Sequence, residues 1–162
     1  MVDLENPPEN TCFGCGPANA RGLHLRFERH LRDDGTPELR TFFLPGPDET
    51  GWPGIYHTGL HFAVLYEVSY WTALELGGQL MVSTGPGTYE HRRLPRVGRM
   101  HLARAHLGPA QSEGQVVEAS TESEDGRPCG TLRSFWRPVE RVEIERAGLA
   151  LPGYLLSEIR SR

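Results

Sequence analysis

The chain has 162 residues, 38% of them hydrophobic, and carries a formal net charge of -4. This length supplies one hydrophobic core but would be cramped as two domains, so we expect a single domain over residues 1–162. The weak negative charge gives no basic field to attract nucleic acid or an anionic membrane surface. Because no apolar run is long enough to span a bilayer and the first residues are acidic and proline-bearing, we expect a cytoplasmic protein.

The cysteines are an odd set of three, which is typical of a reducing compartment. Cys12 and Cys15 have the spacing of a zinc knuckle, although no second pair of this spacing follows. Cys129 and His24 are conceivable additional ligands. We therefore favour cysteines that pack in the core or pin a loop over a structural metal site.

The first third of the chain predicts an arm followed by a β-hairpin. Prolines and glycines recur through residues 1–20, so we expect an extended N-terminal arm without regular structure. Residues 22–31 alternate apolar and polar side chains, which predicts a half-buried strand. The turn sequence at 33–35 leads to extended character at 38–44, and the two strands predict a hairpin. The segment 45–53 (PGPDETGWP) predicts a loop that holds no element.

Residues 60–76 predict one helix of about five turns, because apolar side chains occupy most of its circumference. The glycine pair at 77–78 can close it. On a helical wheel, His61, Thr72 and Glu75 fall on one side, which we expect to face water. A helix this apolar has more surface to cover than one sheet face supplies, which favours a second subunit.

Glu67 falls instead within the apolar side of this helix, in a stripe made by Leu60, Ala63, Val64, Trp71 and Leu74. A carboxylate on an apolar face is costly unless something compensates for the lost hydration. One interpretation pairs Glu67 with an arginine or places it at a subunit boundary. The other makes it a working carboxylate whose pKa is raised by desolvation.

The second half of the chain reads mainly as strands. Residues 79–83 and 88–94 predict two halves of one bent strand. Three further strands of alternating character are expected at 100–107, 115–122 and 128–137. Their regular spacing predicts antiparallel hairpins, separated by turns at 108–114 and 125–126. Residues 139–162 are more charged and predict a C-terminal extension with a helix near its end. The order of elements predicts an α+β fold in which an antiparallel sheet wraps one long central helix.

Several segments resemble, in their order and spacing, the motifs of hotdog-fold acyl-CoA thioesterases of the phenylacetate-pathway and 4-hydroxybenzoyl-CoA thioesterase type. They are CFGCGPANARGLHLRF (12–27), GIYHTGL (54–60), YEHRRLP (89–95) with Gly98, and Asp125-Gly126 before Cys129. The resemblance implies a hotdog fold and a homo-oligomer, either dimer or tetramer, that hydrolyses an acyl-CoA thioester at a subunit interface. It implies no cofactor apart from the coenzyme A of the substrate. A non-catalytic acyl-CoA-binding protein and a hotdog hydratase with His57 as its base are the alternatives.

Two positions depart from the family's motifs. His57-Thr58-Gly59 stands where the family has His-Gly-Gly. The family's helical acid commonly lies nine positions after that histidine, where this chain has Tyr66, and Glu67 follows one place later. One residue turns a helix by about 100°. Either the helix starts differently and Glu67 fills the role, or the acid has been lost.

Thioester hydrolysis needs donors for the developing oxyanion and a base or nucleophile, because the thiol itself leaves readily. Backbone N–H groups at Thr58 and Gly59, where the central helix begins, would face the carbonyl oxygen. Glu67 would activate water or attack directly. His57 would hold the loop or contact the carbonyl.

A basic cluster follows the bent strand. Arg92, Arg93 and Arg96, with Arg99 close behind, would meet the phosphates of coenzyme A, because guanidinium groups suit phosphate. A solvated strand face is the alternative. His57 lies four residues before the helix histidine at position 61, but no third ligand accompanies the two, so we expect no metal site there.

Overall fold

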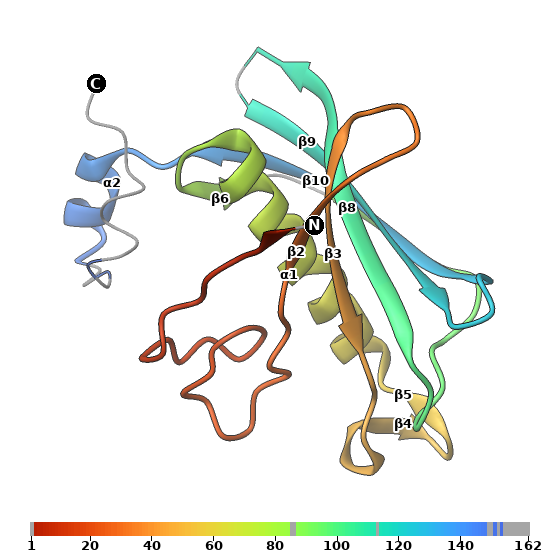
Figure 1. Ribbon diagram of the computed structural model, residues 1–162. Helices are drawn as coiled ribbons and strands as arrows, with labels where there is room; N and C mark the ends of the chain where they lie inside the picture. Colours follow the sequence, from red (N-terminus) through yellow and green to blue (C-terminus); the bar gives the residue numbers. More distant parts are fainter. Residues whose placement is uncertain (1, 85–86, 113, 149–150, 152, 154–162) are drawn as a thin grey trace.

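The computed structural model describes residues 2–84, 87–112, 114–148, 151 and 153. One antiparallel sheet curves around a long helix (Figure 1). The strands are β1 (Val2–Asp3), β2 (Glu28–Leu31), β3 (Pro37–Phe43), β4 (Thr50–Trp52), β5 (Ile55–Tyr56), β6 (Met81–Ser83), β7 (Thr88–His91), β8 (His101–Gln111), β9 (Gly114–Ser123) and β10 (Pro128–Pro138). The helices are the short 3-10 helix η1 (Pro47–Glu49), α1 (Thr58–Gly77) and α2 (Arg141–Arg146).

The large sheet has the strand order β1-β2-β3-β8-β9-β10-β6, and all of its pairs are antiparallel. Strands β6 and β7 both pair with β10, at different points along its length. The bent strand expected over 79–83 and 88–94 is therefore present as two short strands, β6 and β7, that both pair with β10. Strands β4 and β5 form a separate two-stranded sheet.

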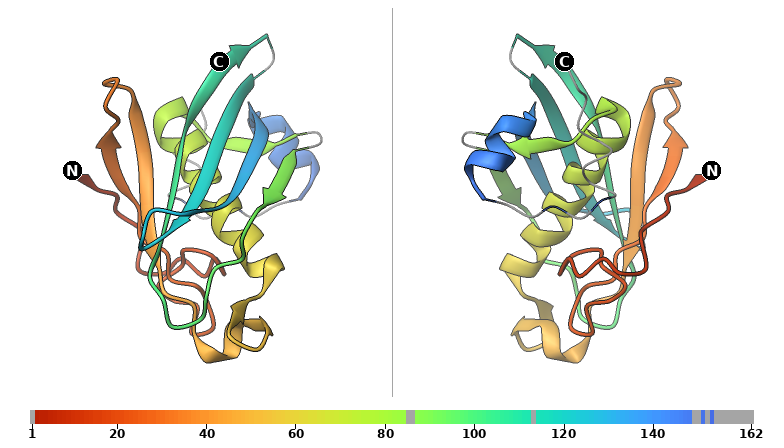
Figure 2. Two further views of the ribbon diagram at one scale, coloured as in Figure 1. Left: turned by 90° about the vertical axis from the view of Figure 1, so that its right-hand side faces the viewer. Right: turned by 90° about the vertical axis from the view of Figure 1, so that its left-hand side faces the viewer.

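Helix α1 packs on β3, β8, β9, β10 and β6, as expected for a helix that a sheet wraps. Figure 2 shows the helix in the hollow of the sheet, with the N-terminal arm beside its first half. Val64, Leu65 and Val68 are fully buried at the centre of the core. Gly78 ends the helix with φ 69°, in the left-handed region that glycine tolerates. The architecture is the α+β hotdog arrangement that the sequence predicts.

The prediction that one side of α1 faces water is wrong for two of its three residues. His61 and Thr72 are completely buried, whereas Glu75 is exposed. Both buried groups have hydrogen-bond partners. Thr72 Oγ1 donates to the Val68 carbonyl at 2.7 Å, and His61 Nε2 lies 2.7 Å from Thr121 Oγ1 on β9. The sheet covers this side of the helix too, and these bonds offset the cost of burying the polar groups.

The strand boundaries differ from expectation in three places. The hairpin of β2 and β3 is confirmed, but β2 begins only at Glu28, because the backbone N–H groups of Leu23 and Leu25 bond to the arm instead. The expected loop at 45–53 contains η1 and β4. Strand β8 continues to Gln111 and β9 starts at Gly114, so the turn expected at 108–114 is shorter. Helix α2 occupies part of the C-terminal extension, and the helix expected near its end lies outside the described residues.

Candidate functional site

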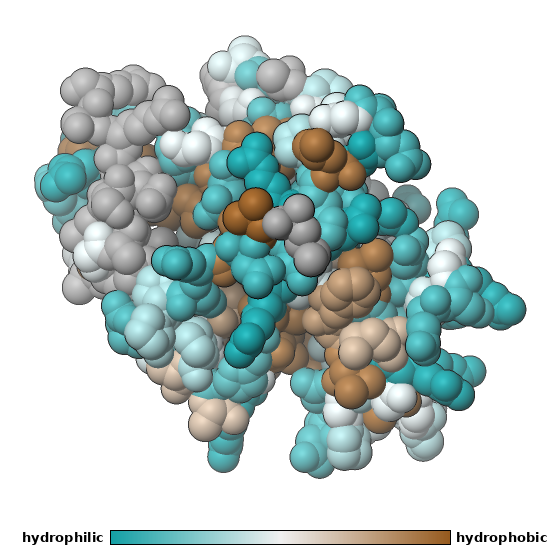
Figure 3. All heavy atoms as spheres, viewed as in Figure 1, coloured by the Kyte–Doolittle hydropathy of each residue, from teal (hydrophilic) through white to brown (hydrophobic). Residues whose placement is uncertain are grey.

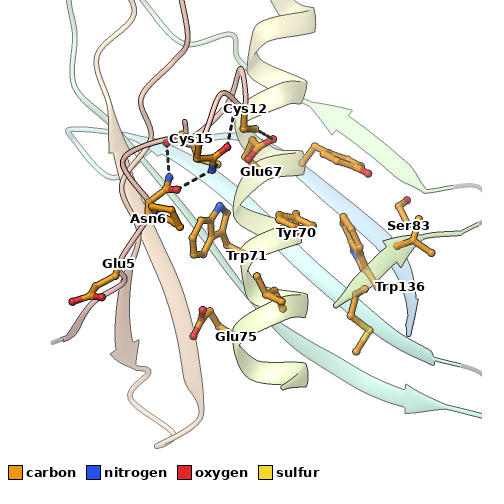
Figure 4. A pocket seen from close by; sticks show the side chains of 16 residues that line it. Glu5, Asn6, Cys12, Cys15, Glu67, Tyr70, Trp71, Glu75, Ser83 and Trp136 are labelled. Carbon is orange, nitrogen blue, oxygen red and sulfur yellow. Dashed lines mark hydrogen bonds between the residues drawn. The ribbon is translucent and has the colours of Figure 1, made fainter. Parts of the chain in front are cut away.

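A cavity of about 490 Å³ lies between the N-terminal arm, the middle of α1 and the strands β6 and β10 (Figure 4). Its lining is mainly aromatic and aliphatic, with a few polar groups from the arm, from α1 and from β6. The lining groups that matter for chemistry are Cys12, Cys15, Tyr66, Glu67, Trp71 and Trp136. A largely apolar cavity with few convergent polar groups is the usual form of a small-molecule site.

Glu67 is carried on α1 and points toward the arm (Figure 4). Its Oε1 lies 3.6 Å from Cys12 Sγ, and its buried Oε2 has no hydrogen-bond partner among the described residues. Burial raises the pKa of Glu67 to about 7. The described part of the chain contains no salt bridge to Glu67, so the arginine pairing considered from sequence is not what holds this carboxylate.

The two cysteines of the arm differ in their affinity for a proton. A hydrogen bond from the Cys15 side chain lowers the pKa of Cys12 to about 5, and the backbone amides of Gly14 and Cys15 act in the same direction. The same contact raises the pKa of Cys15. The arm is held in shape by side-chain amides, since Asn6 Nδ2 donates to the Cys15 carbonyl at 2.6 Å. Cys12 is therefore the group of the pair that carries negative charge most readily.

Two aromatic residues beside Glu67 shape the cavity. The ring of Tyr66 lies 5.2 Å from the ring of Trp136. Trp71 stacks on Phe27 at 5.1 Å, and its buried Nε1 has no hydrogen-bond partner among the described residues. The cavity therefore offers one unpaired donor on Trp71 and one unpaired acceptor on Glu67.

The start of α1 is not part of this cavity. The exposed His57 caps the helix, with Nδ1 accepting from the Gly59 N–H at 3.0 Å. That N–H, expected to face a substrate carbonyl, is engaged inside the chain in this conformation. Thr58 lies nine residues before Glu67, which is about 14 Å along a helix axis. The sequence analysis placed His57, Thr58 and Gly59 with Glu67, and within one chain the structure does not bring them together.

The arginines separate into two surface grooves. Arg93 and Arg96 line a groove of about 530 Å³ together with Arg99 and Arg127. Arg92 lines a different groove, near β9 and β10. The cluster expected from sequence is thus only partly assembled in the structure.

Sequence reasoning did not foresee that the arm reaches the central helix. The ligand atoms of Cys12, Cys15 and Glu67 all lie within 4.8 Å of one another. Within the described residues, neither Cys129 nor His24 belongs to this cluster. The only hints in sequence were a closely spaced cysteine pair and an acid on an apolar helix face, and nothing in their spacing joins them.

No protein-family model and no curated protein sequence matches this chain. Among solved structures, a thioesterase superfamily protein is 19% identical with a TM-score of 0.64, over 75% of this chain and 60% of that chain. A Streptococcus mutans protein bound to acetyl CoA is 11% identical with a TM-score of 0.60, over 70% and 88%. The E. coli PaaI protein from the phenylacetic acid degradation operon is 13% identical with a TM-score of 0.58, over 63% and 72%.

These similarities and the sheet wrapped around α1 define a hotdog-fold protein. The fold implied by the sequence resemblance is thereby confirmed, and the neighbours include proteins of the thioesterase superfamily. None of the helices in the described part of the chain has the length and apolar character needed to cross a membrane.

Proposed function

We propose that this protein hydrolyses an acyl-CoA thioester, with Glu67 activating the attacking water. The observation that carries the proposal is a carboxylate with one unpartnered oxygen on an apolar cavity of about 490 Å³. A carboxylate in such a setting is a strong proton acceptor, because burial disfavours its charged form. The fold supports the substrate class, since one neighbour of this fold is bound to acetyl CoA.

In the proposed reaction, water bonds to Glu67 and attacks the thioester carbonyl carbon. The carboxylate takes the proton, an oxyanion forms, and the carbon–sulfur bond breaks. The thiolate of coenzyme A leaves and takes the proton from Glu67, which restores the carboxylate, and the acyl group departs as a carboxylic acid. The free indole N–H of Trp71 is a donor within the same cavity and would hold the acyl part of the substrate.

The oxyanion donors are assigned to the start of α1 in a second subunit, because the two sites are too far apart within one chain. The backbone N–H of Thr58 is the first donor. The N–H of Gly59 would join it after the ring of His57 turns away from the cap. Apolar side chains remain for a subunit contact: Phe62 on α1 and Val82 on β6 are 39% and 38% exposed. Figure 3 shows further apolar side chains at the surface over the β2–β3 hairpin. A dimer or tetramer is therefore part of the proposal.

Coenzyme A would place its phosphates at the groove that Arg93 and Arg96 line, because guanidinium groups bind phosphate through two parallel hydrogen bonds. Arg92 is a weaker candidate for the same role, since it lines a separate groove. No further cofactor is proposed for the reaction.

A second function is favoured by one observation at the same cavity. The sequence resemblance aligns Tyr66 with the position of the expected helical acid, and Oε1 of Glu67 is engaged by Cys12. A protein that binds an acyl-CoA without cleaving it, as a sensor or carrier, would have these features. The hydrolase and the sensor or carrier would use the same binding site, but only the hydrolase would turn over its ligand.

The test uses acetyl-CoA, octanoyl-CoA and benzoyl-CoA, with detection of the free thiol for hydrolysis and tryptophan fluorescence for binding. Glu67→Gln should lower kcat about 100-fold or more with little change in binding, because it removes the base and keeps the shape of the side chain. Tyr66→Phe is the matched control and should keep most of the turnover. Hydrolysis that survives Glu67→Gln unchanged would exclude this mechanism, and tight binding without turnover would favour the sensor.

A further inference from the structure

The N-terminal arm and α1 bring two thiols and a carboxylate to one point at the edge of the cavity. The ligand atoms of Cys12, Cys15 and Glu67 lie within 4.8 Å of one another, and Figure 4 shows the three side chains converging. Cys12 Sγ and Glu67 Oε1 are 3.6 Å apart. A sulfur and an oxygen bound to the same tetrahedral zinc are about 3.5 Å apart, so these two atoms already have the spacing of ligands.

The backbone around the cysteines is built as a tight turn that holds both sulfurs. The Gly16 N–H donates to the Cys12 carbonyl at 2.9 Å. A Cβ at Gly16 would lie 2.4 Å from the Asn10 carbonyl oxygen, so a side chain there would open the turn. Asn10 Nδ2 lies 3.7 Å from Cys15 Sγ and orients this sulfur from outside the cluster. The turn therefore presents two sulfurs in a fixed arrangement.

The carboxylate supplies a second, independent observation that points to a cation. Glu67 Oε2 is buried without a hydrogen-bond partner among the described residues, no described cationic side chain forms a salt bridge with it, and the Cys15 thiol is its neighbour in the cluster. A buried anionic oxygen without compensation is costly, and a bound cation would remove that cost. Because the cluster lies on the cavity wall, the cavity supplies both an entry path and space for a water molecule on the ion.

We propose that Cys12, Cys15 and Glu67 bind one zinc ion, with a fourth position that faces the cavity. Two thiolates select zinc over magnesium or calcium, and three protein ligands with one open position are typical of zinc sites that bind water or substrate. The sequence analysis favoured a packing role for these cysteines because it lacked a third ligand close to them. Glu67, from the middle of α1, is that ligand.

The zinc site does not depend on the proposed hydrolysis, but zinc binding has a consequence for that reaction. A carboxylate that binds a cation cannot also take a proton from water. Hydrolysis through Glu67 therefore belongs to the metal-free protein, and zinc bound at this cluster would inhibit it.

The test measures binding directly, in the absence of any thioester. The full chain is reduced, treated with a chelator, checked for its three free thiols and titrated with Co²⁺, which reports thiolate ligands through an intense charge-transfer absorption. One Co²⁺ per chain, displaced by Zn²⁺, is expected. Cys12→Ser and Cys15→Ser should abolish the absorption, and Glu67→Gln should weaken binding about tenfold or more.

Cys129→Ser is the matched control, because this thiol lies outside the cluster, and it should bind cobalt like the unmodified chain. Thermal melting of each variant shows that it is folded. A fully reduced protein without the charge-transfer absorption would overturn the proposal. So would an absorption that persists in both Cys12→Ser and Cys15→Ser. Either result leaves the hydrolysis to be judged by the thioester assay alone.

Discussion

The thiol of Cys12 lies 3.6 Å from Oε1 of Glu67, and this contact joins the N-terminal arm to the central helix across 55 positions of sequence. Gly14 makes the approach possible, since its α-carbon passes directly over the Glu67 side chain. The burial of the carboxylate, and with it the raised pKa, therefore depends on a segment that has little regular structure of its own. Loss of the arm contact would return Glu67 to the behaviour of an ordinary exposed acid.

Gly14→Ala should destabilise the protein and displace the arm from Glu67. The added Cβ would lie 2.2 Å from both Cγ and Cδ of Glu67, far inside van der Waals contact. Overpacking of this kind costs about 1–3 kcal/mol, which chemical denaturation would measure as a lower free energy of unfolding. Gly46→Ala is a suitable control, because its nearest neighbour would be 3.9 Å away. Equal stability of the two variants would show that the arm does not pack on Glu67 in solution.

The contribution of His61 to the stability of the fold should fall in mild acid. Tyr89 Oη lies 3.1 Å from His61 Nδ1, and His61 Nε2 lies 2.7 Å from Thr121 Oγ1, which suits a neutral ring that accepts at one nitrogen and donates at the other. Burial, with smaller contributions from His91 and His101, lowers the pKa of His61 from 6.5 to about 4. Between these two pKa values only the unfolded chain takes up the proton. The contribution of His61 to the free energy of unfolding therefore decreases as pH falls, by about 1.4 kcal/mol per pH unit, whereas the raised pKa of Glu67, about 7, contributes in the opposite direction.

The variant His61→Gln separates this effect from other titrating groups. Glutamine can still bond to Thr121 but does not titrate, so its unfolding free energy should depend less on pH between about 6.5 and 4. Above the higher value neither state of the histidine is charged, and the pH dependence of the two proteins should be the same. Denaturation curves at pH 7.5 and pH 5 provide the comparison. Parallel losses of stability in both proteins would mean that His61 is not the group responsible.

The parts of the fold that follow from local pattern could be predicted from sequence. The apolar residues of α1 and the alternating residues of the β2–β3 hairpin and the last three strands indicate their elements without knowledge of the rest. Polar residues on α1 were harder to place. A helical wheel places His61 and Thr72 on the side expected to face water, because it shows neither Thr121, which bonds His61, nor the carbonyl one turn back, which bonds Thr72.

The candidate site could be predicted only in part, because it is made by contacts between distant segments. The position of Glu67 within an apolar stripe was sufficient to single it out, and its burial agrees with that interpretation. Cys12 and Cys15 lie beside it because of the path of the arm, and this path could not be predicted because the arm has no periodic sequence pattern. The engagement of the Gly59 N–H by His57 is likewise a matter of side-chain rotation rather than of sequence spacing.

A shared active site predicts that two inactive variants restore activity when they are mixed. Thr58→Pro removes the proposed oxyanion donor at a position where helices tolerate proline, and it should lower kcat about 100-fold. Glu67→Gln removes the base. If each site takes its base from one chain and its donor from the other, a mixed dimer contains one intact site. Random exchange of subunits should then restore about a quarter of the normal activity, since half of the dimers are mixed and each has one working site of two.

The control for this experiment is a chain that carries both substitutions, which cannot supply an intact site to a partner with either defect. Mixing it with Glu67→Gln should leave the activity at the level of the single variant. Light scattering on the mixed and unmixed samples establishes that subunits associate, because a monomer could not complement at all. If the singly substituted chains associate and exchange but the mixture stays inactive, the base and the donor belong to the same chain, and the site must be rebuilt around the cavity of one protomer.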